Sequence, residues 1–201
     1  MVERRVIERR GPWQVLSRER IYDNRWIRVT HHEVVTPTGQ PGIYGTVHFK
    51  NLAIGVLPVD REHHTYLVGQ YRFSLDAYSW EIPEGGGALD VDPVESAARE
   101  LQEETGLRAG RWQKLFDGDL SNSVTDERCI GYLAWDLEQG RAEPDPTEEL
   151  RVRRLPLEEV FRMVDAGEIR DALSLMTLRA AQILMLQGRF PVPLSGRPEK
   201  D

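Results

Sequence analysis

The sequence of 201 residues predicts an α/β protein: an α/β/α sandwich with a mixed sheet, preceded by a three-stranded antiparallel meander. Three observations lead to this prediction. Segments rich in β-branched and aromatic residues fill the chain up to residue 50. The apolar run NLAIGVLPV at 51–59 is typical of a strand covered on both faces. Helical patterns occur only after residue 92.

The first fifty residues are expected to form the meander. Residues 1–12 are charged and end in Gly11-Pro12, which we interpret as a mobile arm. Turn-forming residues at Asp23-Asn24 and over 36–42 separate the strands that follow. These strands are predicted at about 13–22, 26–36 and 42–50. Because three strands alone bury little surface, the meander must pack on the main body or on a second subunit.

The remaining elements predict the sandwich. Beyond 51–59, strands are predicted near 65–73, 112–118, 127–137 and 149–155, with a short apolar strand at Trp80 before Pro83. Helices are predicted at 156–166 and 170–186. Another helix follows the N-cap Asp92 with Pro93 at its first position, and it ends at Gly106. The last predicted helix carries an apolar stripe interpreted as packing, made of Leu175, Leu178, Ile183 and Leu186. We therefore expect a β extension over 1–50, a main domain over 51–187 and a tail over 188–201.

Composition limits the classes of function. The formal charge of −7 and the lack of a basic block argue against a general nucleic-acid binder. The chain has no long apolar run, and its first residues lack a signal-peptide core, so we expect no membrane association and a cytoplasmic location. The lone Cys129 excludes an intramolecular disulfide and a cysteine-based zinc site, and we interpret it as a core thiol.

Several conspicuous side chains are not expected to bind ligands. His31-His32 and His63-His64 are adjacent pairs, and neighbours on a strand point to opposite faces, so neither pair can share one metal ion. We interpret both pairs as surface residues. Trp112 and Trp135 are expected in the core.

Three glutamates share one face of the helix that begins after Asp92. Glu100, Glu103 and Glu104 stand at positions i, i+3 and i+4, within an arc of about 100°. Like charges at this spacing destabilise an isolated helix by roughly 0.2–0.5 kcal/mol per pair. The opposite face is expected to pack on the core through Val94, Ala97, Ala98 and Leu101. A packed helix that fixes three carboxylates on one side predicts a bound cation.

The segment that contains these glutamates resembles the box of the Nudix hydrolases, G-x5-E-x7-R-E-U-x-E-E-x-G-U, where U is a bulky aliphatic residue. Residues 99–107, RELQEETGL, match its core, and its first glycine falls on Gly85. The one departure is the early glutamate, which is replaced by Val91 between Asp90 and Asp92. Either aspartate is a candidate substitute, so the departure bears on loop geometry and rate rather than on the existence of a metal site.

The resemblance implies roles for particular residues. Glu100 and Glu104 should be the principal ligands of Mg²⁺ or Mn²⁺, with Glu103 close by and the backbone carbonyl of Glu84 as a further ligand. Arg99 should orient the glutamates rather than touch the substrate. Mg²⁺ prefers oxygen ligands and is commonly held by carboxylates together with substrate phosphates. It would neutralise charge at phosphorus and activate water.

Features outside the box are similar to the ADP-ribose and nucleoside diphosphate sugar pyrophosphatase branch of the family. The strand at 65–73 is followed by WEIPEGG, and the N-terminal meander is similar to the extension that contacts substrate across a homodimer in that branch. The resemblance makes Glu127 the catalytic base or a metal ligand; the alternative is a solvated loop acid. Ser121-Asn122-Ser123-Val124 replaces a Ser-Pro-Gly-like turn, so we widen the expected substrate to nucleoside diphosphate sugars, including ADP-ribose and GDP-mannose.

Four residues are candidate substrate contacts. Arg72 ends its strand near the box, where a guanidinium could bind a diphosphate in a bidentate manner. Trp26 could stack on a base or belong to the core of the meander. Arg28 shares its strand face and could bind substrate or form a surface salt bridge. Glu81 could bond to substrate across the dimer or simply end its strand.

Two other functions remain as alternatives. One is hydrolysis of oxidised nucleoside triphosphates or dinucleoside polyphosphates, against which the long N-terminal extension argues. The other is a non-catalytic module that senses nucleotides, for which Val91 is the only support.

Overall fold

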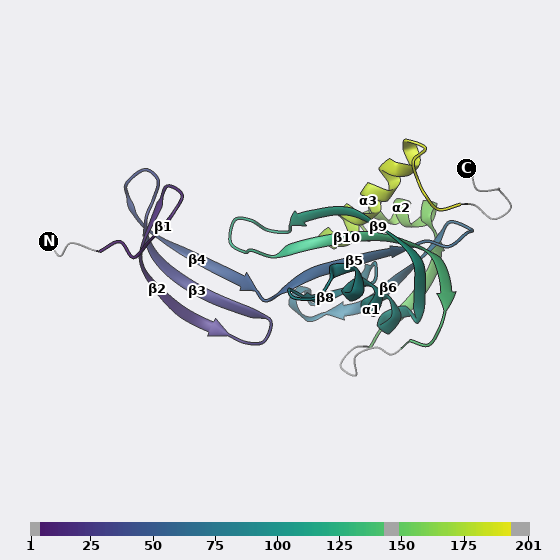
Figure 1. The fold of residues 1–201 in the computed structure, drawn as a ribbon, viewed down its shortest axis with the longest axis horizontal. Coiled ribbons are helices and arrows are strands. Elements are labelled where there is room, and N and C mark those ends of the chain that lie inside the picture. The colour runs from purple at the N-terminus through teal and green to yellow at the C-terminus, as the bar shows by residue number, and fades with distance from the viewer. Residues whose placement is uncertain (1–4, 143–148, 194–201) are drawn as a thin grey trace. The chain divides into compact units, whose positions relative to one another are not determined.

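The computed structural model describes residues 5–142 and 149–193, and the chain forms two compact units (Figure 1). The N-terminal unit comprises residues 1–51 and 119–127. The main unit comprises residues 52–118 and 128–201. Residues 1–4, 143–148 and 194–201 lie outside the described part of the chain.

The N-terminal unit is a four-stranded antiparallel sheet in the order β1-β2-β3-β4. Its strands are β1 (Glu8–Arg10), β2 (Trp13–Asp23), β3 (Ile27–Val35) and β4 (Pro41–Phe49). The three predicted strands are confirmed, but the mobile arm is wrong for residues 8–10. Gly11 has φ +55° and, with Pro12, forms the two-residue turn that pairs Arg10 with Trp13. Hairpin turns require such positive φ values, so Gly11-Pro12 connects two strands rather than ending an arm.

The loop over residues 119–127 belongs to this unit because it is bonded to β4. Thr125 forms a parallel bridge with Val47, and the Tyr44 hydroxyl donates to the Ser123 carbonyl. The Asp126 carboxylate accepts from the Phe49 backbone N–H at 2.8 Å and pairs with His48. Burial would raise the pKa of Asp126, but the hydrogen bonds with His48 and Phe49 outweigh it and lower that pKa. The anchor therefore persists until the pH falls below the ordinary range of an aspartate.

In its described residues, the main unit forms seven strands in two sheets, ordered β8-β5-β10-β9 and β11-β6-β7. The strands are β5 (Asn51–Pro58), β6 (His64–Arg72), β7 (Ala77–Glu81), β8 (Glu84–Ala88), β9 (Leu107–Asp119), β10 (Arg128–Gln139) and β11 (Arg151–Pro156). The helices are α1 (Pro93–Thr105), α2 (Leu157–Asp165) and α3 (Ala172–Leu186), with a short 3₁₀ turn at Phe73–Leu75. Parallel β5 and β10 and antiparallel β6 and β7 make the strand set mixed.

The strands and helices predicted for this unit are confirmed, with one addition and one extension. Strand β8 was not predicted, because glycines usually weaken strands. It forms at the edge of its sheet, and the Val56 N–H of neighbouring β5 donates to the Pro83 carbonyl just before β8. Strand β9 begins at Leu107, earlier than the predicted residue 112.

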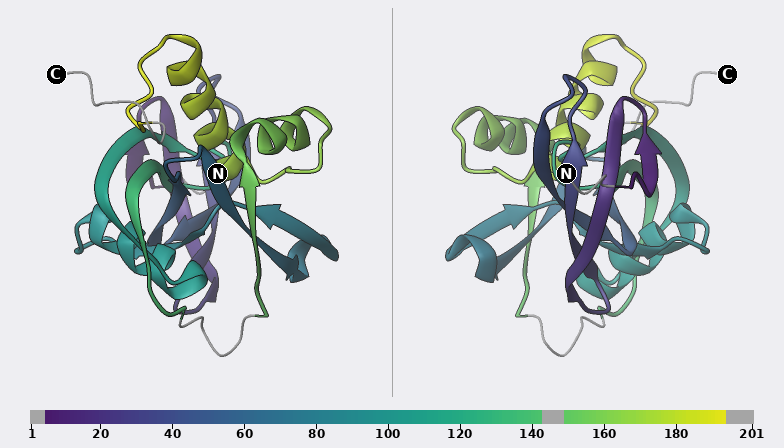
Figure 2. Two further views of the ribbon diagram at one scale, coloured as in Figure 1. Left: turned by 90° about the vertical axis from the view of Figure 1, so that its right-hand side faces the viewer. Right: turned by 90° about the vertical axis from the view of Figure 1, so that its left-hand side faces the viewer.

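Two hydrophobic clusters on opposite faces of β5 confirm the sandwich. Leu52, Ile54 and Val56 pack in one cluster with Ala97 and Leu101 of α1. Leu57 and Val59 belong to the other, together with side chains of α2 and α3. Alternate residues of a strand point to opposite faces, so β5 supplies both layers. Figure 2 shows α1 on one side of these strands and α3 on the other.

Several packing predictions are wrong in detail. Ala98 is exposed, and on α3 Ile183 and Leu186 are 52% and 82% exposed. The buried face of α3 instead runs through Leu173, Ser174, Thr177, Leu178 and Ala181. Two hydroxyl-bearing residues occupy buried positions there because their hydroxyls find hydrogen-bond partners inside the fold.

Predictions about single side chains had mixed outcomes. His32 is buried rather than at the surface, because its Nδ1 bonds to the Tyr44 carbonyl at 3.1 Å. Cys129 is fully buried, as predicted, and Trp112 and Trp135 pack at the margins of the core. In the expected tail, Val192 is buried and its carbonyl bonds to His63.

Within the described residues, none of the helices is both long enough and apolar enough to cross a bilayer. The cytoplasmic location and the boundaries of the three expected regions stay predictions.

Candidate active site

Helix α1 fixes the three glutamates through the caps that the sequence predicts. The Asp92 side chain accepts from the Val94 N–H at 3.0 Å, and Gly106 ends the helix with φ +75°. Glu100 and Glu104 are buried, only 9% and 5% exposed, whereas the Glu103 side chain is 40% exposed. Burying a carboxylate is costly unless it is paired, so the surroundings of Glu100 and Glu104 must compensate their charge.

Arg99 provides part of this compensation and ties the helix to β8. Its guanidinium donates to Glu100 at 2.6 Å, to Glu103 at 2.7 Å and to the Gly86 carbonyl at 2.8 Å. Burial would lower the pKa of Arg99, but Glu100 and Glu103 outweigh it and raise that pKa. This is the geometry expected of a residue that orients the glutamates; the role itself stays a prediction.

Close backbone approach brings β8 against the buried carboxylates. A Cβ atom at Gly85 would lie 2.3 Å from the Glu100 carboxylate, so a larger residue fits only if that side chain or the β8 backbone shifts. The Glu84 N–H donates to Glu104 Oε2 at 3.0 Å. The segment around Gly85 therefore presents its backbone to both buried glutamates.

Val91 occupies the position at which the Nudix box has its early glutamate. Val91 is 38% exposed, and its N–H donates to the Ala88 carbonyl at 3.2 Å in the turn before α1. Asp92, one of its two candidate substitutes, is engaged as the helix cap. Asp90, the other, is exposed.

A second acidic group lies beside Glu84, and the sequence analysis did not anticipate it. Potential ligand atoms of Glu81, Glu84 and Asp171 all lie within 4.8 Å of one another. Arg72 binds both carboxylate oxygens of Glu81 and reaches Glu84 at 3.1 Å. Burial, followed by the charges of Asp171 and Glu81, raises the pKa of Glu84 well above its ordinary value. Asp171 could be recognised from sequence as a helix cap, but its proximity to Glu84 could not.

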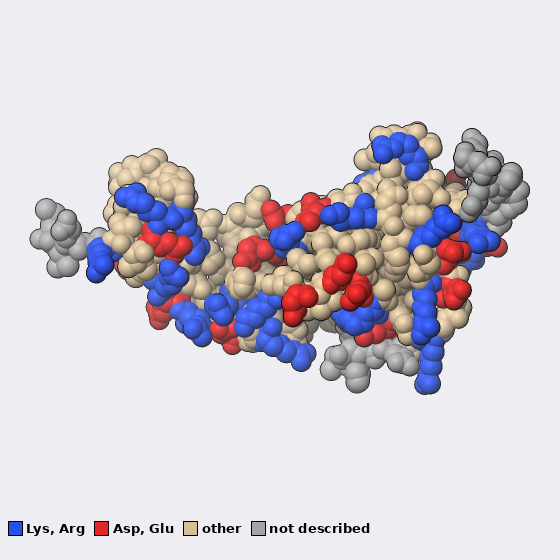
Figure 3. Space-filling view, viewed as in Figure 1, with Lys and Arg blue, Asp and Glu red and all other residues tan. Residues whose placement is uncertain are grey.

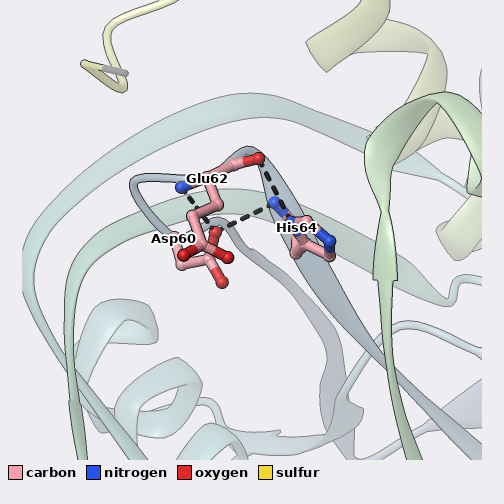
Figure 4. A group of neighbouring side chains, drawn as sticks. All are labelled: Asp60, Glu62 and His64. Atoms are coloured by element: carbon pink, nitrogen blue, oxygen red, sulfur yellow. Dashed lines mark hydrogen bonds between the residues drawn. The ribbon is translucent and has the colours of Figure 1, made fainter. Parts of the chain in front are cut away.

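A third group, at the turn between β5 and β6, consists of Asp60, Glu62 and His64 (Figure 4). Asp60 Oδ1 accepts from the backbone N–H groups of Glu62 and His64, at 2.9 and 3.0 Å. Arg154 of β11 binds Asp60 at 2.8 Å and Glu62 at 2.6 Å. The Arg154 guanidinium already pairs with both carboxylates, so we interpret the group as a network that holds the turn.

The remaining candidates divide between the two units. Arg72 and Glu81 are in the main unit, and Trp26, Arg28 and Glu127 are in the N-terminal unit. Trp26 precedes β3 and is 52% exposed, which excludes a core position, and the Arg25 guanidinium lies 4.0 Å from its ring centroid. Arg28 forms the surface salt bridge considered for it, with Asp23 at 3.1 Å.

The N-terminal unit also contains a cavity of about 790 Å³ that the sequence analysis did not anticipate. Strands β1 to β4 and residues 122–126 line it, and its walls include the aromatic side chains of Trp13 and Tyr44. Four arginines also contribute: Arg10, Arg18, Arg20 and Arg28. Figure 3 shows blue Lys and Arg side chains gathered over the N-terminal strands.

Comparison with protein-family models decides the family. A model described as the NUDIX domain matches residues 49–177. The chain belongs to the Nudix family. A second model, described as the nucleoside diphosphate sugar hydrolase N-terminal domain, matches residues 13–47. The expected resemblance to this branch of the Nudix hydrolases is therefore confirmed.

Known Nudix relatives cover most of the chain. It is 35% identical over 147 residues to the ADP-ribose pyrophosphatase of Mycobacterium tuberculosis, covering 71% of this chain and 70% of the relative. It is 28% identical over 172 residues to the ADP-ribose pyrophosphatase of Bacillus subtilis, covering 85% and 92%. A crystal structure of an ADP compounds hydrolase matches with a TM-score of 0.77 and 22% identity, over 87% of this chain and 95% of that one, which supports the fold.

Nudix hydrolases generally use a divalent metal, and the residues of this site suit one. Buried carboxylates of Glu100 and Glu104 meet the backbone next to Gly85, which makes an oxygen-only donor set of the kind that hard cations prefer. Glu103 is paired with Arg99. Within the described part of the chain, the carboxylate oxygens of the three helix glutamates do not all lie within 4.8 Å of one another.

Proposed function

We propose that this protein is a Mg²⁺-dependent Nudix pyrophosphatase that hydrolyses a nucleoside diphosphate sugar to a nucleoside monophosphate and a sugar phosphate. ADP-ribose and GDP-mannose are the candidate substrates. The observation that carries the proposal is the pair of buried glutamates on α1, held against Gly85 in a chain that also matches the nucleoside diphosphate sugar hydrolase extension. The names of the two ADP-ribose pyrophosphatase relatives support the choice of substrate.

Within this proposal, Glu100 and Glu104 hold the metal together with Glu103 and the Glu84 carbonyl. When bound, Mg²⁺ would neutralise charge on the diphosphate and activate water. Arg99 keeps Glu100 and Glu103 in place, as its three hydrogen bonds suggest. Glu127 is the candidate general base that accepts the proton of the attacking water. The Asp126 anchor to β4 would fix the loop that carries it.

We propose roles in substrate binding for four residues. Arg72 is the candidate for the diphosphate, with Glu81 as the carboxylate that orients its guanidinium through their hydrogen bonds. Trp26 is the candidate for stacking on the base, which its exposure permits. Arg28 lines the cavity of the N-terminal unit and is the candidate for a phosphate or ribose contact.

The activity is tested by incubating the protein and Mg²⁺ with ADP-ribose, GDP-mannose or UDP-glucose and separating the products. We expect a nucleoside monophosphate to appear from at least one substrate. EDTA should abolish its formation and excess Mg²⁺ should restore it, because in this proposal the ion neutralises charge on the reacting phosphates and activates the attacking water. Absence of product from every nucleotide sugar would refute the proposal.

Because Val91 replaces the early glutamate of the Nudix box, we retain a second candidate function: a module that binds nucleotides without hydrolysing them. Nucleotide binding by calorimetry in the absence of product would favour it. Release of inorganic pyrophosphate from oxidised nucleoside triphosphates would instead favour the housecleaning hydrolase.

We also propose that the protein is a homodimer. Apolar side chains at the tip of the β6–β7 hairpin are exposed: Tyr71 59%, Phe73 97%, Leu75 67% and Tyr78 44%. Exposed apolar groups that gather in this way commonly mark an interface.

Sedimentation equilibrium should give twice the monomer mass of 23.1 kDa, and Phe73→Glu should shift the mass toward the monomer. Leu186→Glu, at an exposed leucine of α3, is the matched control and should remain dimeric; a monomeric parent protein would contradict the proposal.

A further inference from the structure

Ser174 is a buried polar residue of α3 to which the box assigns no role. It is fully buried in the first turn of the helix. The cap residue Asp171 accepts from the Ser174 N–H at 2.7 Å, which fixes the position of this turn. A hydroxyl in such a place must find partners, and it finds them on the segment that leads into the Nudix site.

The hydroxyl bonds to two residues of that segment. It accepts from the Ile82 N–H at 3.1 Å and lies 3.4 Å from Glu84 Oε2, to which it can donate. Because a hydroxyl has one hydrogen to donate and lone pairs to accept, both contacts can form together. Ser174 therefore links the residues on either side of Pro83.

The same short segment is held from its other side by the metal-site glutamate. Proline has no N–H, so Ile82 and Glu84 supply the backbone donors here. Ile82 donates to Ser174, and Glu84 donates to Glu104 Oε2 at 3.0 Å. The Pro83 carbonyl accepts from Val56 at 2.8 Å. Ser174 on α3 and Glu104 on α1 thus fix opposite ends of the segment Ile82-Pro83-Glu84.

We infer that Ser174 is a positioning residue for the metal site: it holds the Ile82 backbone and the Glu84 side chain so that the Glu84 carbonyl and Glu104 can bind one ion together. This inference rests on the metal site of the proposed function. Ser174 does not touch the metal or the substrate. Removing its hydroxyl leaves the Ile82 N–H without its acceptor in a buried position, so the segment must shift to find another.

The test is to titrate the protein with Mn²⁺ in the absence of substrate and to measure the concentration of the free ion by electron paramagnetic resonance. Ser174→Ala should weaken Mn²⁺ binding by roughly 10-fold, as loss of an outer-shell partner does. Its apparent KM for ADP-ribose at saturating metal should stay unchanged. Thr177→Val is the matched control, because the buried Thr177 hydroxyl on the same helix donates to the Leu173 carbonyl one turn back. Should Ser174→Ala fold poorly, Ser174→Cys keeps a side chain of the same shape, slightly larger, with a weaker hydrogen-bonding group and should weaken binding in the same direction.

Unchanged Mn²⁺ affinity in a folded Ser174 variant would overturn the inference, and so would an equal loss in Thr177→Val. Asp171→Asn preserves the helix cap and should bind Mn²⁺ like the parent protein. Loss of binding in that variant would mean that Glu81, Glu84 and Asp171 hold the ion themselves, which also overturns it. Because binding is measured without turnover, a parent protein that binds Mn²⁺ but hydrolyses no nucleotide sugar would refute the proposed function alone.

Discussion

Glu104→Gln is expected to lower kcat for nucleotide-sugar hydrolysis by roughly a thousandfold, equivalent to about 4 kcal/mol of lost transition-state stabilisation. The substitution removes the negative charge of a candidate metal ligand that is only 5% exposed. A glutamine side-chain oxygen can still accept from the Glu84 N–H, so the hydrogen bond that now measures 3.0 Å is retained. The loss should therefore appear in kcat at saturating Mg²⁺ and not in the thermal unfolding temperature.

Glu95→Gln is the matched control for this experiment. Glu95 lies exposed in the first turn of the same helix, so its substitution removes the same charge away from the site. It should retain full turnover and lose only a small part of the helix-dipole stabilisation. A Glu104→Gln enzyme as active as the Glu95 variant would remove Glu104 from the metal site.

Gly85→Ala is expected to reduce kcat by roughly a hundredfold and to destabilise the fold by about 1–3 kcal/mol. The added Cβ would lie 2.3 Å from the Glu100 carboxylate, so either that side chain or the β8 backbone must move. Both belong to the surface that faces the metal. Steady-state kinetics and chemical denaturation of the same preparation measure the two effects.

Gly118→Ala separates the specific contact from the general effect of adding a methyl group. Gly118 lies in β9 of the same unit, and the nearest atom to an added Cβ, the sulfur of Cys129, is 4.0 Å away. This variant should retain activity and stability. If Gly85→Ala also retained activity and stability, the close approach of the Gly85 backbone and the Glu100 carboxylate would not matter for function.

Local patterns made helix α1 and its glutamates predictable. The signals for this helix lie at its own ends: the N-cap Asp92, the proline after it and the terminal Gly106. The spacing of Glu100, Glu103 and Glu104 likewise fixes their common face without reference to the rest of the fold. A helix with such signals can be located from sequence, and here its bounds were correct.

Elements that depend on distant partners were not predictable. Strand β8 forms on a glycine-rich segment because β5 supplies an edge to pair with. Strand β1 is only three residues long, too short for an alternating pattern. Asp171 and Ser174 reach Glu84 from a helix about ninety residues away in the chain, so the sequence offers no spacing from which to infer their contact. The apolar stripe predicted on α3 shows the converse: Leu175 and Leu178 pack on the core, whereas Ile183 and Leu186 are exposed.

The loop over 119–127 makes the N-terminal unit discontinuous along the chain. A gene fragment that begins at residue 52 would therefore encode a protein whose loop has lost the hydrogen bonds to Phe49 and Tyr44. The N-terminal extension is consequently not an independent domain that can be removed as one continuous segment. Any recombination that replaces the first fifty residues must also replace this distant nine-residue stretch, so the two segments are expected to be inherited and to diverge together.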